Sequence, residues 1–242
     1  MSNNIPDRPP PAVYLIPSPL HESAPGSVHP SALEAVKNCR VFFVENERTA
    51  RRFLKQIWKE MVIDAYEWYA IHKAEEEVLT TFRQKIREGI SVGIISEAGC
   101  PGIADPGQLL IAAAQEMNAV IKPLVGPSSI LLALMASGMN GQQFQFWGYL
   151  PIQEPERTKI IRELEAESIR KNSTQVFIET PYRNNQLISS LLKTCRPDTL
   201  LCLAVDLTTE QEWIRTKPVS QWKKEMPDIH KRPAIFCLYC PS

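Results

Sequence analysis

The chain has 242 residues, of which 44% are hydrophobic, and its 27 Lys and Arg residues balance 27 Asp and Glu residues. A chain of this length can bury a large core, as one domain or as two. The zero formal net charge excludes the broad positive field of a protein that binds bulk nucleic acid, but it leaves room for a local basic patch. No apolar run is long enough to span a bilayer, and the first residues lack the apolar segment of a signal peptide, so we expect a cytoplasmic protein with no membrane partner.

Strands and helices alternate through the first half of the chain. A proline-rich lead over residues 1–11 is predicted to be disordered. Short apolar, β-branched runs predict strands at 12–16, 41–44, 62–66, 92–95 and 120–125. Helical periodicity predicts helices at 30–37, 47–59, 74–88 and 108–117. This alternation is typical of a parallel sheet.

The pattern starts again in the second half. Strands are predicted at 144–150, 174–179, 200–205, 210–216 and 233–239. Helices are predicted at 130–136, 155–170 and 184–194. Some connections are too short for a crossover helix, which indicates antiparallel pairing in this half. We therefore expect an α/β fold with two domains, residues 12–121 and 122–242.

One loop, residues 96–107, is the strongest candidate for a binding site. It follows a buried strand, precedes a helix and holds three glycines and two prolines. Glycines let another molecule approach the backbone closely, and ligands of open α/β sheets bind at the carboxyl ends of the strands. The alternative is a long turn in which Asp105 caps the following helix.

Several common chemistries lack their residues. The chain has no dinucleotide fingerprint, no phosphate-binding P-loop and no serine-hydrolase elbow, and the serines at 128 and 129 are explained by helix capping. Its histidines show no ligand spacing; they are His21, His29, His72 and His230. The pair Cys237 and Cys240 has no second pair to complete a zinc site, so we favour core packing and expect no metal.

The helix predicted at 47–59 carries a row of basic side chains, namely Arg48, Arg51, Arg52 and Lys55. A solvated helix face is the favoured interpretation. A phosphate-binding patch is the alternative.

Seven segments, in register over almost the whole chain, resemble the tetrapyrrole methylase superfamily. Residues 96–107 resemble its S-D-A-G-T-P-G-I-S-D-P-G segment, and residues 126–129 resemble P-G-P-S-A. The other five are at 14–19 (first-strand motif), 45–48 (E-D-T-R), 146–151 (F-x-G-F-L-P), 179–183 (E-S-P-H-R) and 206–208 (E-L-T). The nearest branch is that of the cytidine 2′-O-methyltransferases of small-subunit ribosomal RNA.

The resemblance implies that S-adenosylmethionine binds in a cleft between two α/β domains. Carried over by position, its contacts would be Pro19, Ala98, Gly99, Cys100, Ile103, Ser128, Ser129, Glu179, Leu207, Pro233 and Ala234. Small residues and bare backbone at strand ends agree with a polar ligand held without long side chains.

The resemblance also implies ribosomal RNA, or the small ribosomal subunit, as acceptor and a homodimer as the assembly. Glu97 is a candidate general base by its position, or else a carboxylate that orients loop amides. Arg48 and Arg183 could contact RNA phosphates, or could form ion pairs between domains or subunits.

The chain departs from the RNA branch mainly in its first loop. Residues 19–26 lack the G-N-L that follows the first-strand motif, Glu97 replaces Asp, residues 46–47 replace D-T, and Tyr182 replaces His. These departures leave two alternatives: a methylase of a tetrapyrrole or other small molecule, and a protein that binds S-adenosylmethionine without catalysis.

Overall fold

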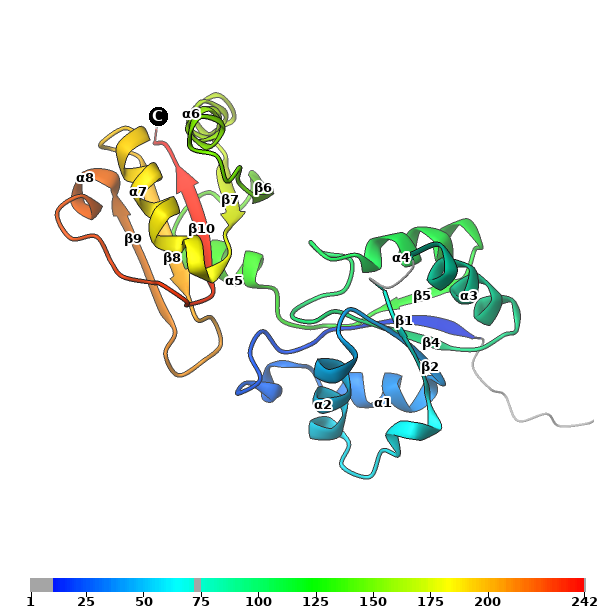
Figure 1. Ribbon diagram of the computed structural model, residues 1–242. Coiled ribbons are helices and arrows are strands. Elements are labelled where there is room, and N and C mark those ends of the chain that lie inside the picture. Colours follow the sequence, from blue (N-terminus) through cyan, green and yellow to red (C-terminus); the bar gives the residue numbers. More distant parts are fainter. Residues whose placement is uncertain (1–10, 72–74, 242) are drawn as a thin grey trace, which may run out of the picture. The chain divides into compact units, whose positions relative to one another are not determined.

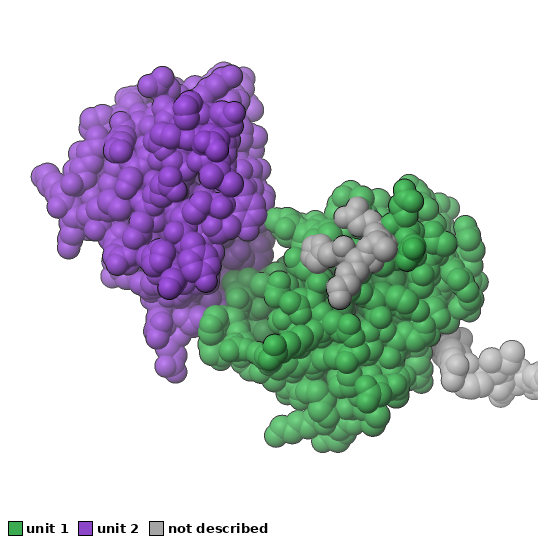
Figure 2. Space-filling model, viewed as in Figure 1, with its two compact units in different colours: residues 1–127 green, residues 128–242 purple. Residues whose placement is uncertain are grey.

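The computed structural model describes residues 11–71 and 75–241, so the expected disordered lead lies, except for Pro11, outside the described residues, as does His72. The chain divides into two compact units, residues 1–127 and 128–242 (Figure 2). Each unit has its own sheet. The sequence-based boundary at 121/122 passes through a strand that pairs within the first unit. Within the described part, no helix has the length and apolarity of a membrane span.

The first unit contains a five-stranded parallel sheet in the order β3-β2-β4-β1-β5. Its strands are β1 (Ala12–Ile16), β2 (Val41–Val44), β3 (Glu67–Ala70), β4 (Val92–Ile95) and β5 (Val120–Pro123). The strands β2 and β4 are buried at every residue, as expected for central strands covered on both faces.

Helices cover both faces of this sheet (Figure 1). One layer has α1 (Ser31–Asn38) and α2 (Glu47–Ile57), and the other has α3 (Glu75–Arg87) and α4 (Gly107–Glu116). Two short 3₁₀ turns, η1 (Pro25–Ser27) and η2 (Ile63–Ala65), complete the unit. Each layer closes its own cluster of buried side chains, which include Leu54 on one face and Phe82 on the other.

The strand predicted at 62–66 is wrong, because that segment forms η2 and the edge strand β3 begins at Glu67. Aromatic pairing determines the position of β3. Trp68 stacks on Phe42 at a centroid distance of 4.9 Å, and Tyr69 stacks on Phe43 at 5.2 Å on the opposite face. Large aromatic side chains gain more from these cross-strand contacts than the preceding residues can.

The second unit contains a mixed sheet in the order β6-β7-β10-β8-β9, in which only β6 and β7 pair in parallel. Its strands are β6 (Phe144–Tyr149), β7 (Thr174–Ile178), β8 (Leu200–Val205), β9 (Trp213–Pro218) and β10 (Ala234–Tyr239). The antiparallel pairing predicted from the short connections is confirmed.

Four helices and a 3₁₀ turn pack on this sheet: α5 (Ser129–Ser137), α6 (Glu154–Lys171), η3 (Pro181–Arg183), α7 (Asn184–Thr194) and α8 (Val219–Trp222). The core contains Phe177 stacked on Phe236 across β7 and β10, at 5.6 Å. Cys237 lies opposite Cys202 in the ladder and Cys240 contacts Thr199, so both cysteines of the C-x-x-C pack inside the unit. No cluster of potential metal ligands occurs among the described residues.

Candidate functional site

The loop after β1 and the loop after β4 are joined by their main chains. The N–H of Ser18 donates to the carbonyl of Gly99 at 2.9 Å, and the N–H of Gly99 donates to the carbonyl of Ser18 at 3.1 Å. The buried hydroxyls of Ser18 and Ser96 add donations to the carbonyls of Ser96 and Gly99, both at 2.8 Å. These four bonds, which we call the Ser18–Gly99 clasp, fix both loops at the carboxyl edge of the sheet.

Asp105 fixes the rest of the loop. One of its carboxylate oxygens accepts from the N–H groups of Gly102 and Gly107, both at 2.8 Å. Gly107 is the first residue of α4, so Asp105 both closes the loop and binds the start of the helix. Gly99 and Gly102 adopt φ of 78° and 82°, the left-handed region that glycine enters at little cost. The structure confirms the contact between Asp105 and the start of the helix, and binding of a ligand by this loop stays a prediction.

The G-P-S-S segment closes on the same loops. A Cβ added at Gly126 would lie 2.2 Å from Pro17 Cβ, so only glycine fits there without a shift. The thiol of Cys100 donates to the carbonyl of Pro127 at 3.4 Å. Burial, followed by the charge of Asp105, raises the pKa of this thiol. Three motifs distant in the sequence are thus in contact within the first unit.

Glu97 follows β4 at the same edge and is exposed. Its N–H donates to Glu45 Oε2 at 2.8 Å, so a different carboxylate, Glu45, orients this loop amide. Oε1 of Glu97 lies 3.4 Å from both Asn46 Nδ2 and Thr49 Oγ1. Asn46 caps α2 by accepting from the N–H of Thr49, which holds the start of that helix beside Glu97.

A pocket of about 280 Å³ opens beside this carboxylate, and we call it the Glu97 pocket. Its walls are residues 18–22 of the first loop, Thr49, Arg52, Phe53 and Gln56 of α2, and Glu97 with Ala98. No motif in the sequence singles out Thr49, Phe53 or Gln56. Their spacing of three and four residues on one helix face was the available signal.

The basic row on α2 is largely paired. Arg51 forms an ion pair with Glu47 and lies over the Trp68 ring, 5.1 Å from its centroid. Arg52 pairs with Glu22. These contacts agree with a solvated, ion-paired helix face. Arg48 is exposed and forms no ion pair within the part of the chain that the structure describes.

In the second unit, β7 and β8 end at the edge of the sheet where β10 begins, because both pair antiparallel with β10. This topology brings together Glu179, Leu207, Pro233 and Ala234. The side chain of Glu179 is fully buried. Its Oε2 has no hydrogen-bond partner among the described residues. A buried carboxylate oxygen without a donor is costly, so this atom is available to accept a hydrogen bond from a ligand.

Arg183 is engaged at this edge. Its Nη2 and Nε donate to Oε1 of Glu179 at 2.7 and 3.0 Å, and the N–H of Thr180 donates to the same oxygen at 2.6 Å. The structure thus pairs a predicted phosphate contact with a predicted cofactor contact, inside one unit. The side chain of Arg183 is about one third exposed.

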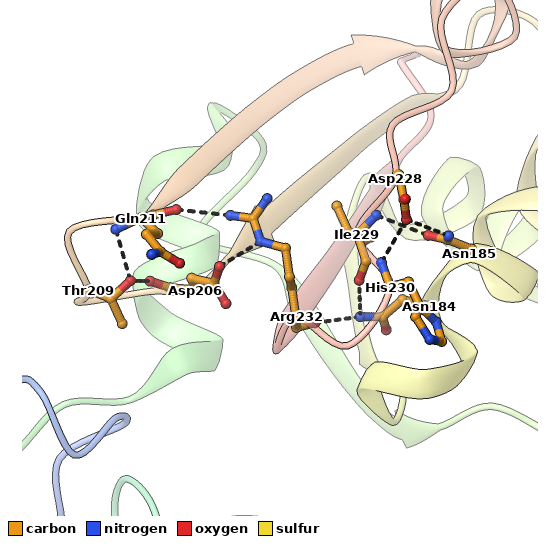
Figure 3. A network of polar contacts seen from close by, with 9 residues as sticks. All are labelled: Asn184, Asn185, Asp206, Thr209, Gln211, Asp228, Ile229, His230 and Arg232. Atoms are coloured by element: carbon orange, nitrogen blue, oxygen red, sulfur yellow. Dashed lines mark hydrogen bonds and ion pairs between the residues drawn. The ribbon is translucent and has the colours of Figure 1, made fainter.

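Arg232 holds the segment that leads into β10 (Figure 3). Its Nε donates to Asp206 Oδ2 at 2.6 Å, and its Nη2 donates to the carbonyl of Gln211 at 3.0 Å. The buried Asn184 donates from Nδ2 to the Arg232 carbonyl at 2.6 Å. The N–H of Asp206 also donates to the carbonyl of Pro233 at 2.9 Å. Arg232 was missed from the sequence because its partners come from two distant segments, the connection between β8 and β9 and the start of α7.

Ser128 caps α5, as predicted, by accepting from the N–H of Leu131 at 3.5 Å. Ser129 is the first residue of that helix, and both serines are partly exposed.

The family model of the tetrapyrrole (corrin/porphyrin) methylases matches residues 23–222. The chain belongs to this family. It is therefore a methyltransferase, as the seven motifs predicted.

Curated relatives share the RNA branch that the motifs indicated. One from Vibrio cholerae, named ribosomal RNA small subunit methyltransferase I, is 26% identical over 87% of this chain and 70% of its own length. A protein of the same name from Micromonospora olivasterospora is 32% identical over 83% of this chain. The matched region spans only 60% of that relative's length.

Solved structures confirm the fold class. A diphthine synthase aligns with a TM-score of 0.67 at 13% identity, covering 95% of this chain and 90% of its own. The methyltransferase CobJ aligns with a TM-score of 0.61 at 18% identity, covering 94% and 92%. A uroporphyrin-III C-methyltransferase from Thermus thermophilus, solved with S-adenosyl homocysteine, has a TM-score of 0.55 at 16% identity, covering 94% and 97%.

Proposed function

We propose that this methyltransferase uses S-adenosylmethionine and methylates a ribose 2′-hydroxyl of small-subunit ribosomal RNA. The names of the curated relatives and the RNA-branch motifs support this acceptor. The departures of residues 19–26 from the RNA branch concern the loop beside the Glu97 pocket and leave the Ser18–Gly99 clasp in place.

The cofactor contacts that we propose fall into two groups, one in each unit. The first unit contributes Pro19, Ala98, Gly99, Cys100 and Ile103 around the clasp. The second contributes Ser128, Ser129, Glu179, Leu207, Pro233 and Ala234.

The observation that carries this assignment is Oε2 of Glu179, a buried acceptor with no donor. A ribose hydroxyl of the cofactor would supply that donor. Ile103 supports the assignment too, since an isoleucine that is 56% exposed in a fixed loop is suited to covering an apolar part of a ligand.

The protein's part in the reaction is alignment and proton removal. When bound, S-adenosylmethionine supplies an electrophilic methyl group, and methyl transfer is favoured by fixed positions of donor and acceptor. The clasp provides a rigid wall for that purpose. Glu97 is the group that we propose as general base for the acceptor hydroxyl, because its carboxylate lines the pocket next to Ala98. Arg48 and Arg183 are the proposed phosphate contacts.

The direct test is transfer of labelled methyl groups to small ribosomal subunits from a bacterial strain that lacks this modification. We expect label in the RNA and a 2′-O-methylated nucleoside after digestion. Label on a base, or on no RNA at all, would contradict the acceptor. Calorimetry with S-adenosylmethionine tests the cofactor separately, and absence of binding at millimolar concentration would contradict both parts.

Glu97 has a matched pair of variants. Glu97→Gln removes the base and should lower kcat by about 10²-fold, within the usual range for general-base catalysis, with an unchanged Kd for S-adenosylmethionine. Glu97→Asp restores the residue of the family pattern and should retain most activity. Equal kcat for Glu97→Gln and the wild type would limit Glu97 to a structural role.

A further inference from the structure

We propose that the Glu97 pocket receives one ribonucleoside of the acceptor RNA, and that the Glu22–Arg52 ion pair makes it select the uncharged sugar and base over a phosphate. This proposal rests on the proposed function, since it identifies the acceptor subsite of that reaction.

The position and size of the pocket fit this occupant. Pro19 and Ala98, two of the proposed cofactor contacts, form part of its wall, so a molecule inside it adjoins the methyl donor. Its volume of about 280 Å³ is near the lower end for small-molecule sites, which is enough for one nucleoside but too small for a tetrapyrrole ring. A base in folded RNA must leave its stack to enter such a pocket, as in other enzymes that act on single nucleotides.

The lining combines apolar and polar side chains. Leu20 is partly buried and can pack against a ring, whereas Phe53, which is only 3% exposed, adds a small part of the wall. Thr49, Gln56 and Glu97 supply a hydroxyl, an amide and a carboxylate, which can hydrogen-bond to sugar hydroxyls and base edges. A few polar groups on an apolar surface are typical of a site for a neutral, hydrogen-bonding ligand.

The charge balance of the pocket disfavours a phosphate. Arg52 is its guanidinium, and Glu22 from the first loop is already bound to it. Glu97 adds a second carboxylate, so two carboxylates line the pocket beside one guanidinium and the imidazole of His21. A phosphate would have to displace Glu22 and would meet repulsion from Glu97. Both acidic side chains belong to segments in which this chain departs from the RNA branch.

The test is a titration of the isotope-labelled full chain with free cytidine and free uridine, with S-adenosylhomocysteine present. We expect chemical-shift changes at the amides of Thr49, Gln56 and Glu97, and no such changes with inorganic phosphate. Gln56→Ala should weaken nucleoside binding about tenfold, the loss of roughly one hydrogen bond, with an unchanged Kd for S-adenosylmethionine. The control Lys59→Ala, an exposed position outside the pocket, should bind as the wild type does.

A second variant tests the charge argument. Glu22→Gln frees Arg52, so inorganic phosphate should now shift the α2 amides and nucleoside binding should persist. Absence of nucleoside shifts at millimolar concentration, shifts confined to the second unit, or phosphate binding to the wild-type pocket would each overturn the proposal.

The two proposals fail in different ways. The titration reads the pocket directly, whatever the acceptor, and can be repeated without S-adenosylhomocysteine. Nucleoside binding in the pocket without methylation of ribosomal subunits would refute the acceptor and leave the subsite in place. Methylation that Gln56→Ala does not change, in either KM or kcat, would refute the subsite alone.

Discussion

Gly126→Ala probes the contact that joins the G-P-S-S segment to the first loop. The added Cβ would lie 2.2 and 2.3 Å from Cβ and Cγ of Pro17, whereas carbon atoms normally pack at about 3.5–4.0 Å. The ring of Pro17 is closed onto its own backbone and cannot swing away, so the backbone next to Ser18 must move. Gly126 is not in the left-handed region, so the cost is steric and should be about 1–3 kcal/mol of unfolding free energy.

Gly26→Ala is the matched control, because its added Cβ meets nothing within 4 Å and its φ is ordinary. We expect it to change stability by less than about 0.5 kcal/mol. Urea unfolding gives the stability of each variant, hydrogen exchange of β1 and β4 locates the loss, and calorimetry gives the Kd for S-adenosylmethionine. We expect Gly126→Ala to weaken cofactor binding at least about tenfold, which corresponds to 1.4 kcal/mol at the clasp. If both variants had the same unfolding midpoint and Kd, the clasp would not depend on this contact.

Three further outcomes follow from the polar contacts. Arg232→Ala should lower the free energy of unfolding by about 1–2 kcal/mol and raise the Kd for S-adenosylmethionine, and Arg232→Lys should have an intermediate effect. An unchanged Kd would argue against contact between Pro233 and the cofactor. Cys100 should react slowly with iodoacetamide at pH 7 and faster at pH 9, since its raised pKa leaves little thiolate, as peptide mass spectrometry can measure. The hydrogen bond from Lys85, followed by that from Tyr69, lowers the pKa of Glu67 from 4.5. The Glu67–Lys85 ion pair therefore stabilises the fold above pH 4.5, and its contribution is lost as the pH falls through the lowered pKa of Glu67. Glu67→Gln should remove this dependence of stability on acid pH, which amounts to less than about 1 kcal/mol because the Glu67 side chain is half exposed. Identical acid unfolding curves for the variant and the wild type would argue against a stabilising ion pair.

The sequence predicted the buried strands best. The strands at 12–16, 41–44, 92–95 and 200–205 have the bounds that their apolar runs indicated. Strands covered on both faces need apolar residues throughout, so their limits show directly in the sequence. Edge strands lack this signal. The strand predicted at 210–216 starts at Trp213 instead, because Asp206 and Thr208 take positive φ and the N–H of Thr208 donates to Glu212.

The location of the site was predictable, but its side-chain pairing was not. The loops after β1 and β4 lie at one edge because the strands of a parallel sheet end there, and the pairing of β1 with β4 places the two loops side by side. The pairing of Arg52 with Glu22 joins a helix to a loop 30 residues away, and nothing in the spacing selects that partner. The same holds for Arg183, whose choice between RNA and Glu179 depends on how η3 places its side chain.

The Ser18–Gly99 clasp has an evolutionary consequence. Two of its four bonds join main-chain atoms, so they do not depend on the identity of the neighbouring side chains. Mutations at positions 20–22 and at 97 can therefore accumulate without breaking the main-chain bonds of the clasp. Relatives that keep these main-chain bonds can therefore differ in the methyl acceptor and retain the same loop structure.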